Sequence, residues 1–181
     1  TIRLYSFQTD VVYQVLKRDG VCYSKEEYVR KKYKESAKVF INAYGWFVKE
    51  AQHIVPKPEG AEYPYWAFTD LYNVDQTGDG HVLTLDVPIG EAILFDMFDW
   101  TKIMQMHYIG ENESEEATFS EELKNMGMNE FQIMTSNFYP EQKARIQESW
   151  KRLFGHQQAI EAGDNSGVHS VQAGLWCIKG E

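Results

Sequence analysis

The stretch Val168–Ile178, with the sequence VHSVQAGLWCI, decides the fold that we expect for this chain. Apolar and polar side chains alternate along it, which predicts a strand. Its β-branched and aromatic residues favour a central place in a sheet. At the other end of the chain, Ile2–Phe7 (IRLYSF) also alternates between apolar and polar side chains and predicts a first strand. Strands at both ends with helices between them predict an α+β fold, in which the two ends pair in one mostly antiparallel sheet flanked by several helices.

Helical spacing dominates the sequence after the first strand. After a polar turn at residues 9–10, apolar side chains recur at helical intervals until Gly20, which predicts a helix that ends there. Ser24 and Glu27 have the spacing of a capping box, so we expect a second, long helical segment to begin there and to run to Ala51.

Glycine and proline divide this helical pattern further. A break is expected near Gly45, and Pro56 ends the long segment. Residues 110–118 are acidic and polar, which predicts an exposed loop. Three more helices are expected, over residues 97–106, 120–126 and 140–154.

Three further strands are expected in the middle of the chain. Residues 63–71 are rich in aromatics, and residues 81–87 alternate. The Gly/Asp-rich connector 73–80 predicts that these two strands form an antiparallel pair. A short strand over 92–95 then leads at Asp96 into a helix, which Asp96 is suited to cap.

One segment, Asp75–Asp86, resembles a calcium-binding loop, with oxygen-bearing side chains at its first, third and fifth positions and a glycine at its sixth. Thr77, apolar Leu83 at the ninth position and strand-like flanks depart from that motif, so we interpret the segment as a hairpin turn. The five histidines are scattered without zinc spacing. We therefore expect no metal, and single out His107 as the histidine to follow.

Length and charge bound the class of protein. The 181 residues fit one domain, spanning residues 1–181, and no linker is visible. Eighteen basic and twenty-seven acidic residues give a net charge of −9, which disfavours general nucleic-acid binding. Aromatic residues make up 14% of the chain, more than a core alone needs, so some of them are available for a binding surface.

Cysteine use and hydropathy predict a cytoplasmic protein. Cys22 and Cys177 carry neither metal spacing nor a disulfide framework, so we expect free thiols in a reducing compartment. We see no apolar run of membrane-spanning length and no leader-like start, so we expect no membrane association.

Several polar and aromatic residues fall where a small-ligand cleft would need them. Neutral amides beside aromatic rings suit a planar, hydrogen-bonding ligand such as a nucleobase or nicotinamide. The alternative is that the tryptophans belong to the core and that the glutamines cap turns. The candidates are Gln8, Tyr65, Trp66, Asp96, Trp100, Gln172 and Trp176.

At these residues the chain resembles an uncharacterised bacterial family, catalogued as domain of unknown function 3841. The resemblance covers nearly the whole length, and the family has no activity to carry over. The sequence departs from the family pattern after Asp96, where that pattern usually has a second acidic residue followed by Trp-His. The matching segments are Leu4–Gln8, Tyr63–Phe68, Ala92–Asp96 with Trp100, Ser149–Phe154 and Val171–Trp176.

The order of strand, polar turn, helix and glycine also resembles the start of small ADP-ribosyltransferases. That resemblance implies NAD as a cofactor, with Gln8 holding the ribose, Tyr65 or Trp66 stacking on nicotinamide, and Gln172 in place of the catalytic Glu. Gln172 is neutral and supplies no negative charge to an oxocarbenium-like transition state, so Asp96 would have to supply it.

Two functions therefore stay open. The first is an NAD-dependent transferase in which Gln172 and Asp96 are catalytic, while Gln8 and the aromatic rings of Tyr65, Trp66 and Trp100 hold the ligand. The second is a non-enzymatic ligand-binding or protein-interaction domain in which the same aromatic rings form core or partner surface.

Overall fold

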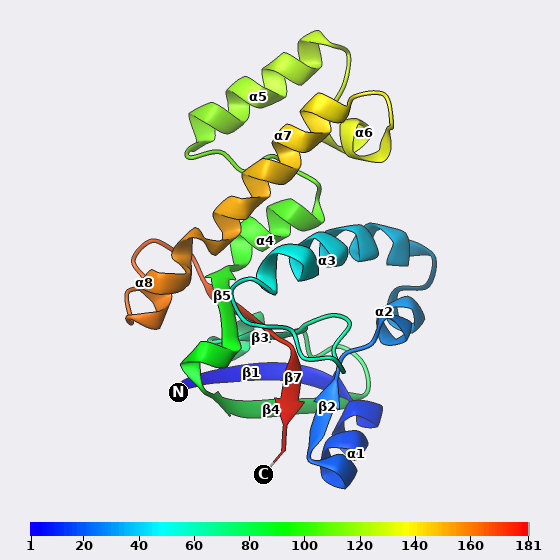
Figure 1. Ribbon diagram of the computed structural model, residues 1–181, viewed down its shortest axis with the longest axis vertical. Helices are drawn as coiled ribbons and strands as arrows, with labels where there is room; N and C mark the ends of the chain where they lie inside the picture. Colours follow the sequence, from blue (N-terminus) through cyan, green and yellow to red (C-terminus); the bar gives the residue numbers. More distant parts are fainter. Residues whose placement is uncertain (181) are drawn as a thin grey trace.

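A computed structural model describes residues 1–180 (Figure 1). Its central sheet has five strands in the order β4-β1-β3-β6-β5, and every neighbouring pair is antiparallel. The predicted α+β class is confirmed, and so is a sheet that contains strands from both ends of the chain. The strands are β1 (Ile2–Thr9), β3 (Tyr65–Phe68), β4 (Gly80–Val87), β5 (Ala92–Asp96) and β6 (Val171–Leu175).

The predicted neighbours within the sheet are wrong in two places. β3 and β4 do not form a hairpin, because β1 lies between them and pairs with both. The two ends of the chain share the sheet without pairing, because β3 separates β1 from β6. Alternation identifies a strand and the face that it buries, but it carries no information about which strand lies next to it.

The Asp75–Asp86 segment is consequently not a hairpin turn between adjacent strands. Asp75 accepts hydrogen bonds from the backbone N–H and the hydroxyl of Thr77, at 3.0 and 2.7 Å, which makes a local turn. Within residues 1–180, no group of three or more His, Cys, Asp or Glu side chains is arranged to hold a metal ion.

The predicted final strand is split in two. β6 ends at Leu175, and after Trp176 the chain continues as β7 (Cys177–Lys179), which pairs with β2 (Val21–Tyr23) in a separate small sheet. The Trp176 indole N–H donates to the carbonyl of Val55 at 2.7 Å at the point of the split. β2 was not predicted, since three residues are too few to display a period.

Helices make up much of the chain outside the sheets. The predicted helix 140–154 appears as an α-helix continued by a 3-10 helix. The loop expected over 110–118 is partly wrong, because a helix already begins at Glu113. The helices are α1 (Asp10–Asp19), α2 (Glu26–Tyr33), α3 (Ala37–Ala51), α4 (Met97–Met104), α5 (Glu113–Asn125), α6 (Glu130–Thr135), α7 (Pro140–Trp150) and α8 (Gln157–Glu161), with the 3-10 helices η1 (Lys34–Ser36), η2 (Leu71–Asn73), η3 (Ile89–Glu91) and η4 (Lys151–His156).

Helix ends agree with the prediction at α1 and differ at α2. Gly20 ends α1 in the left-handed conformation, with φ of 72°. The capping box at Ser24 is not formed, because the backbone N–H of Glu26 instead donates to the carboxylate of distant Glu62 at 2.7 Å. The break in the long helical segment lies at Lys34, where φ is 49°, and α3 passes through Gly45 without interruption.

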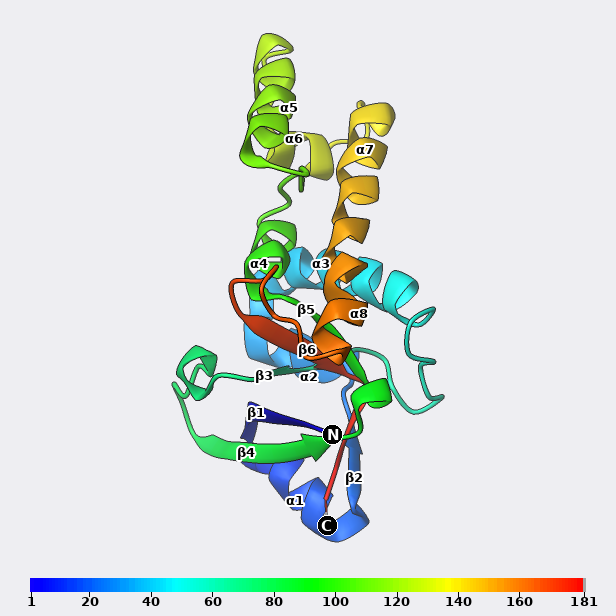
Figure 2. The same cartoon turned by 90° about the vertical axis from the view of Figure 1, so that its left-hand side faces the viewer.

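The central sheet separates two apolar cores. One face packs against α1, α8 and the small sheet through residues such as Leu4, Leu94 and Ile178. The other face packs against α3 and α4 through residues such as Phe47 and Phe95, and this core continues into α5, α6 and α7. These three helices form an arm beyond α4, at the end of the molecule opposite to α1 (Figures 1 and 2). No helix within residues 1–180 is both long enough and apolar enough to cross a membrane.

Candidate functional site

The strand register places the two predicted ligand-holding glutamines on opposite faces of the sheet. Tyr5 lies opposite Phe68, and Phe68 lies opposite Gln172, so these three side chains share one face. Gln8 is three residues from Tyr5 along β1 and therefore points to the other face. The sheet lies between the two carboxamides, so they do not line the shared cleft that the sequence suggested.

The predicted aromatic residues divide in the same way. Tyr65 is buried in the core beside α1, where its hydroxyl lies 3.0 Å from the thiol of Cys22. Trp66 and Trp100 belong to the other core, with ring centroids 4.7 Å apart, and Trp100 is only 6% exposed. Tyr65 and Trp100 are therefore core residues. Trp66 is partly exposed, but its indole N–H is buried without a hydrogen-bond partner among the described residues.

Each of the two glutamines has a local environment of its own. The Gln8 carboxamide donates to the hydroxyl of Ser6 at 2.8 Å, and that hydroxyl donates to the carbonyl of Trp66 at 2.6 Å. Gln172 is buried, with Phe68 and Phe95 as its register partners on the two neighbouring strands. Neither arrangement brings Gln8 or Gln172 next to Asp96, whose register partner is Val171.

Asp96 lies at the junction of β5 and α4 and fixes two segments there. Its carboxylate accepts from the N–H groups of Phe98 and His169, both at 3.1 Å, and from the Nδ1 of His169 at 2.9 Å. Burial raises the pKa of this carboxyl, but the hydrogen bonds from His169 and the backbone outweigh it and lower the pKa overall. The capping role expected for Asp96 is thereby confirmed.

A second carboxylate and a second imidazole lie beside this junction. Burial, followed by the nearby charge of Asp96, raises the pKa of Asp99. The Nε2 atom of His156 lies 3.6 Å from the Asp99 carboxylate. Two carboxyls whose pKa values are displaced in opposite directions are typical of acid–base sites, although buried structural pairs also produce such shifts.

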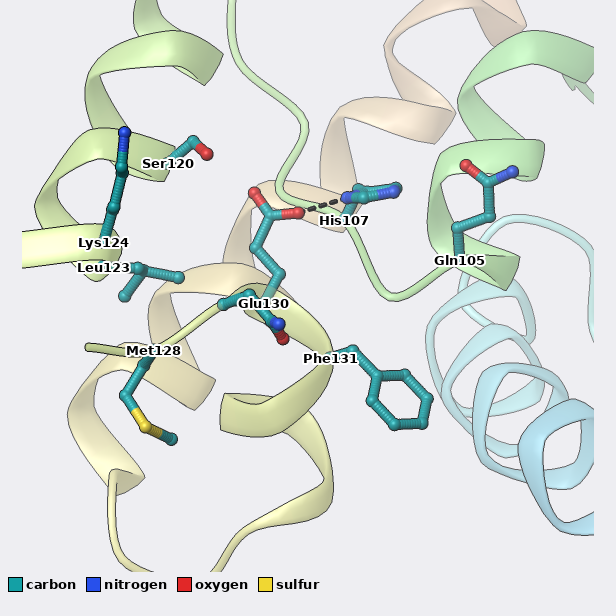
Figure 3. Close-up of a pocket in the computed structure, with 9 residues that line it drawn as sticks. Gln105, His107, Ser120, Leu123, Lys124, Met128, Glu130 and Phe131 are labelled. Atoms are coloured by element: carbon teal, nitrogen blue, oxygen red, sulfur yellow. Dashed lines mark hydrogen bonds and ion pairs between the residues drawn. The ribbon is translucent and has the colours of Figure 1, made fainter. Parts of the chain in front are cut away.

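A pocket of about 510 Å³ lies farther along the chain, between the end of α4 and helices α5 and α6 (Figure 3). This volume falls in the range of ordinary ligand pockets, roughly 300–1,000 Å³. Leu123, Met128 and Phe131 supply its apolar lining. The polar lining consists of Gln105, His107, Ser120, Lys124, Asn129 and Glu130.

His107 and Glu130 form a carboxylate–imidazole pair in this pocket (Figure 3). The carboxylate of Glu130 meets the Nδ1 of His107, and this hydrogen bond, opposed by partial burial, raises the pKa of His107. The carbonyl of His107 accepts the indole N–H of Trp150 at 2.7 Å, which ties the segment to α7. A reciprocal cap between Asn129 and Gln132 fixes the start of α6 and thereby Glu130.

Sequence reasoning singled out His107 but missed the residues that give it a site. Glu130 is 23 residues away and lies on α6, a helix of six residues that was not predicted. His169 was likewise missed, because its partner Asp96 is 73 residues distant. The signal available in the sequence was the capping pattern Asn129-Glu130-Phe131-Gln132, which marks a helix start.

Comparison with curated proteins finds no match, and comparison with solved structures finds none either. A family model described as "Domain of unknown function (DUF3841)" matches residues 3–181. The family resemblance noted in the sequence is confirmed by this match, whereas the resemblance to ADP-ribosyltransferases is not shown by it. The chain belongs to the family of the domain of unknown function 3841.

Proposed function

We propose that this domain binds a small organic ligand of about nucleotide size in the pocket between α4, α5 and α6. One observation carries the proposal: an apolar wall and an imidazole with a shifted pKa meet in one pocket of about 510 Å³. Phe131 is 53% exposed, so its ring is available to stack on a planar group of the ligand. Gln105, Ser120 and Lys124 also line the pocket and offer hydrogen-bond partners.

The proposed ligand is of the kind expected from the sequence, but its proposed binding site is a different one. A nucleotide-sized ligand was expected at the sheet, on Gln8 and Gln172, which lie on opposite faces. The pocket in the helical arm is of suitable size without either residue. NAD remains one of the ligands to test there.

Thermal unfolding in the presence of a ligand panel tests the proposal. The panel contains NAD, ADP-ribose, AMP and adenosine, each at millimolar concentration. A ligand at 100 times its Kd stabilises the folded state by about 2.7 kcal/mol, which raises the midpoint of unfolding by several degrees. We expect at least one compound to do so.

Two phenylalanine variants locate the binding. Phe131→Ala removes an exposed ring from the pocket and should weaken binding roughly tenfold while changing stability little. Phe138→Ala is the matched control, because Phe138 is 88% exposed on the same arm and does not line the pocket. The proposal fails if no compound stabilises the protein, or if the two variants bind the compound equally well.

A second function, acid–base catalysis at the β5–α4 junction, is favoured by the opposite pKa displacements of Asp96 and Asp99. In this proposal, Asp96 holds the Nδ1 of His169, the free Nε2 acts as the base, and Asp99 donates a proton. The His169 side chain is 68% exposed, so a substrate has access to it. Asp96 keeps the catalytic role expected from the sequence, and His169 replaces Gln172.

Release of nicotinamide from NAD tests the form of this chemistry that the sequence suggested. The expected result is release by the unaltered protein and its loss in His169→Ala, with His53→Ala as a matched control. His53 lies just after α3, outside the segments that form the junction. Absence of release by the unaltered protein removes the NAD-cleaving transferase from consideration.

A further inference from the structure

The side chains that line the pocket in the arm lie on two sides of Glu130. Figure 3 shows Gln105, His107 and Phe131 on one side of Glu130, with Ser120 and Lys124 on the other. We infer that the ligand of this pocket carries an anionic group, a phosphate or a carboxylate, which is bound by the Nε2 of His107 beside the carboxamide of Gln105. This inference rests on the proposed function and names the ligand class for that same site.

The hydrogen bond to Glu130 decides which chemistry His107 presents to the ligand. The carboxylate of Glu130 occupies the Nδ1 position, so Nδ1 carries a proton in both the neutral and the cationic ring. The remaining nitrogen, Nε2, therefore accepts a hydrogen bond when the ring is neutral and donates one when it is cationic. A cationic ring beside an anionic ligand makes a charge-assisted hydrogen bond, about twice as strong as a neutral one.

The charges around His107 favour the cationic ring. Glu130 raises the pKa of His107 most, Glu116 raises it further, and Lys102 lowers it. Lys102 and Glu116 form an ion pair at 2.7 Å, so their effects on the ring partly cancel. The proton on His107 offsets the charge of Glu130, which would otherwise repel an anion. Lys124 on the opposite wall adds positive charge to the pocket.

The rest of the ligand meets an apolar surface. Phe131 lies on the same side of Glu130 as His107 and Gln105 (Figure 3), and half of its surface is exposed. Met128 extends the apolar lining, and the fully buried Leu123 of α5 lies behind it. An anion attached to a planar or apolar body fits this side of the pocket, with the charge at His107 and the body against Phe131.

Binding of such a ligand is linked to a proton. The cationic ring binds the anion, so affinity is full below the pKa of His107, which lies above its ordinary value of 6.5. As pH rises through that pKa the ring loses its proton, and affinity falls by up to about tenfold per pH unit. By reciprocity, the bound anion raises the pKa of His107 further.

Paired probes with and without charge test the inference on the full chain. Benzoate is compared with benzamide, and AMP with adenosine, so that the carboxylate and the phosphate arms are separate. Binding is followed by NMR chemical shifts between about pH 6 and pH 9. Benzoate keeps a constant charge over this range, whereas a phosphate titrates at about pH 6, so the benzoate pair reports the proton of His107 alone. At the lower pH, we expect the charged member of at least one pair to bind roughly tenfold more tightly than its neutral counterpart. This difference in affinity should shrink as pH rises.

Two variants separate a charged role of His107 from a merely structural one. His107→Gln should remove the pH dependence of anion binding. Lys124→Gln should weaken anion binding but leave its pH dependence unchanged. Equal binding of charged and neutral probes, or an unchanged pH profile in His107→Gln, overturns the inference. If neutral probes still bind and Phe131→Ala still weakens them, the proposed function survives that result. If no probe binds, both fail.

Discussion

Two carboxylate–imidazole pairs, Asp96–His169 and Glu130–His107, look alike and differ in their surroundings. In both, a nearly buried carboxylate meets the Nδ1 of an exposed histidine, with side-chain exposures of 4% and 68% in the first pair and of 13% and 51% in the second. Asp96 also accepts three backbone N–H groups, from Phe98, His169 and Ser170. Glu130 instead shares a 510 Å³ pocket with its histidine.

The difference shows that a carboxylate–imidazole pair does not by itself identify a ligand-binding site. At Asp96 the backbone donors give the carboxylate a structural role, because it caps α4 and holds the segment that enters β6. At Glu130 the clearest effect of the carboxylate is on the pKa of His107. Ligand binding is therefore our leading proposal for the second pair, whereas at the first pair the structure shows the capping role and catalysis is the second proposal.

The largest expected effect is on stability, and it comes from Asp96→Ala. The substitution removes the acceptor of partly buried N–H groups at the start of α4 and at His169, which costs about 2–3 kcal/mol of unfolding free energy. Glu130→Ala removes a pair whose histidine is half exposed and should cost no more than about 1 kcal/mol. Urea denaturation of both variants at neutral pH measures the difference, and equal costs would contradict the comparison.

The cost of Asp96→Ala should itself depend on pH. The folded-state pKa of Asp96 is lowered, so its stabilisation is present above the unfolded-state value and is lost as pH falls through the folded-state one. Repeating the denaturation in acid should therefore bring the variant and the unaltered protein closer together. A difference that persists unchanged in acid would mean that the carboxylate charge is not what stabilises the junction.

A smaller effect with the opposite sign is expected from Asp99→Asn. Burial raises the folded-state pKa of Asp99, so its ionisation destabilises the fold as pH rises through that value. Asn removes the charge, and stability at neutral pH should rise by up to about 1 kcal/mol, with no gain in acid. A loss of stability at neutral pH would show that the contact with His156 outweighs the burial of charge.

The smallest expected effect is a change in the pKa of His107, and it tests whether Glu130 acts on the histidine of the second pair. NMR titration of the ligand-free protein should place the pKa of His107 above its ordinary value of 6.5, and Glu130→Gln should lower it. Glu122→Gln is the control, because Glu122 pairs with Arg145 on the neighbouring helices. The same pKa in both variants would remove Glu130 as the cause.

The candidate site was only partly predictable, and the reason is sequence separation. His107 and Asp96 attracted notice because each follows a recognisable element, and the structure gives a partner to both. Their partners Glu130 and His169 lie 23 and 73 residues away, so no local pattern joins them. Gln8 and Gln172 failed as a site for a related reason. The two strands that carry them were predicted, but the strand pairing that directs their side chains to opposite faces was not.

The sequence by itself determined the α+β class, most of the strands and helices, and the strands from both ends in one sheet, because alternation and helical spacing record which face of each element is buried. Only the tertiary structure decided that β1 lies between β3 and β4, that the last strand divides at Trp176, and that a pocket forms between α4, α5 and α6. Those features arise from contacts between distant segments, and local periodicity carries no record of which distant segment will lie alongside.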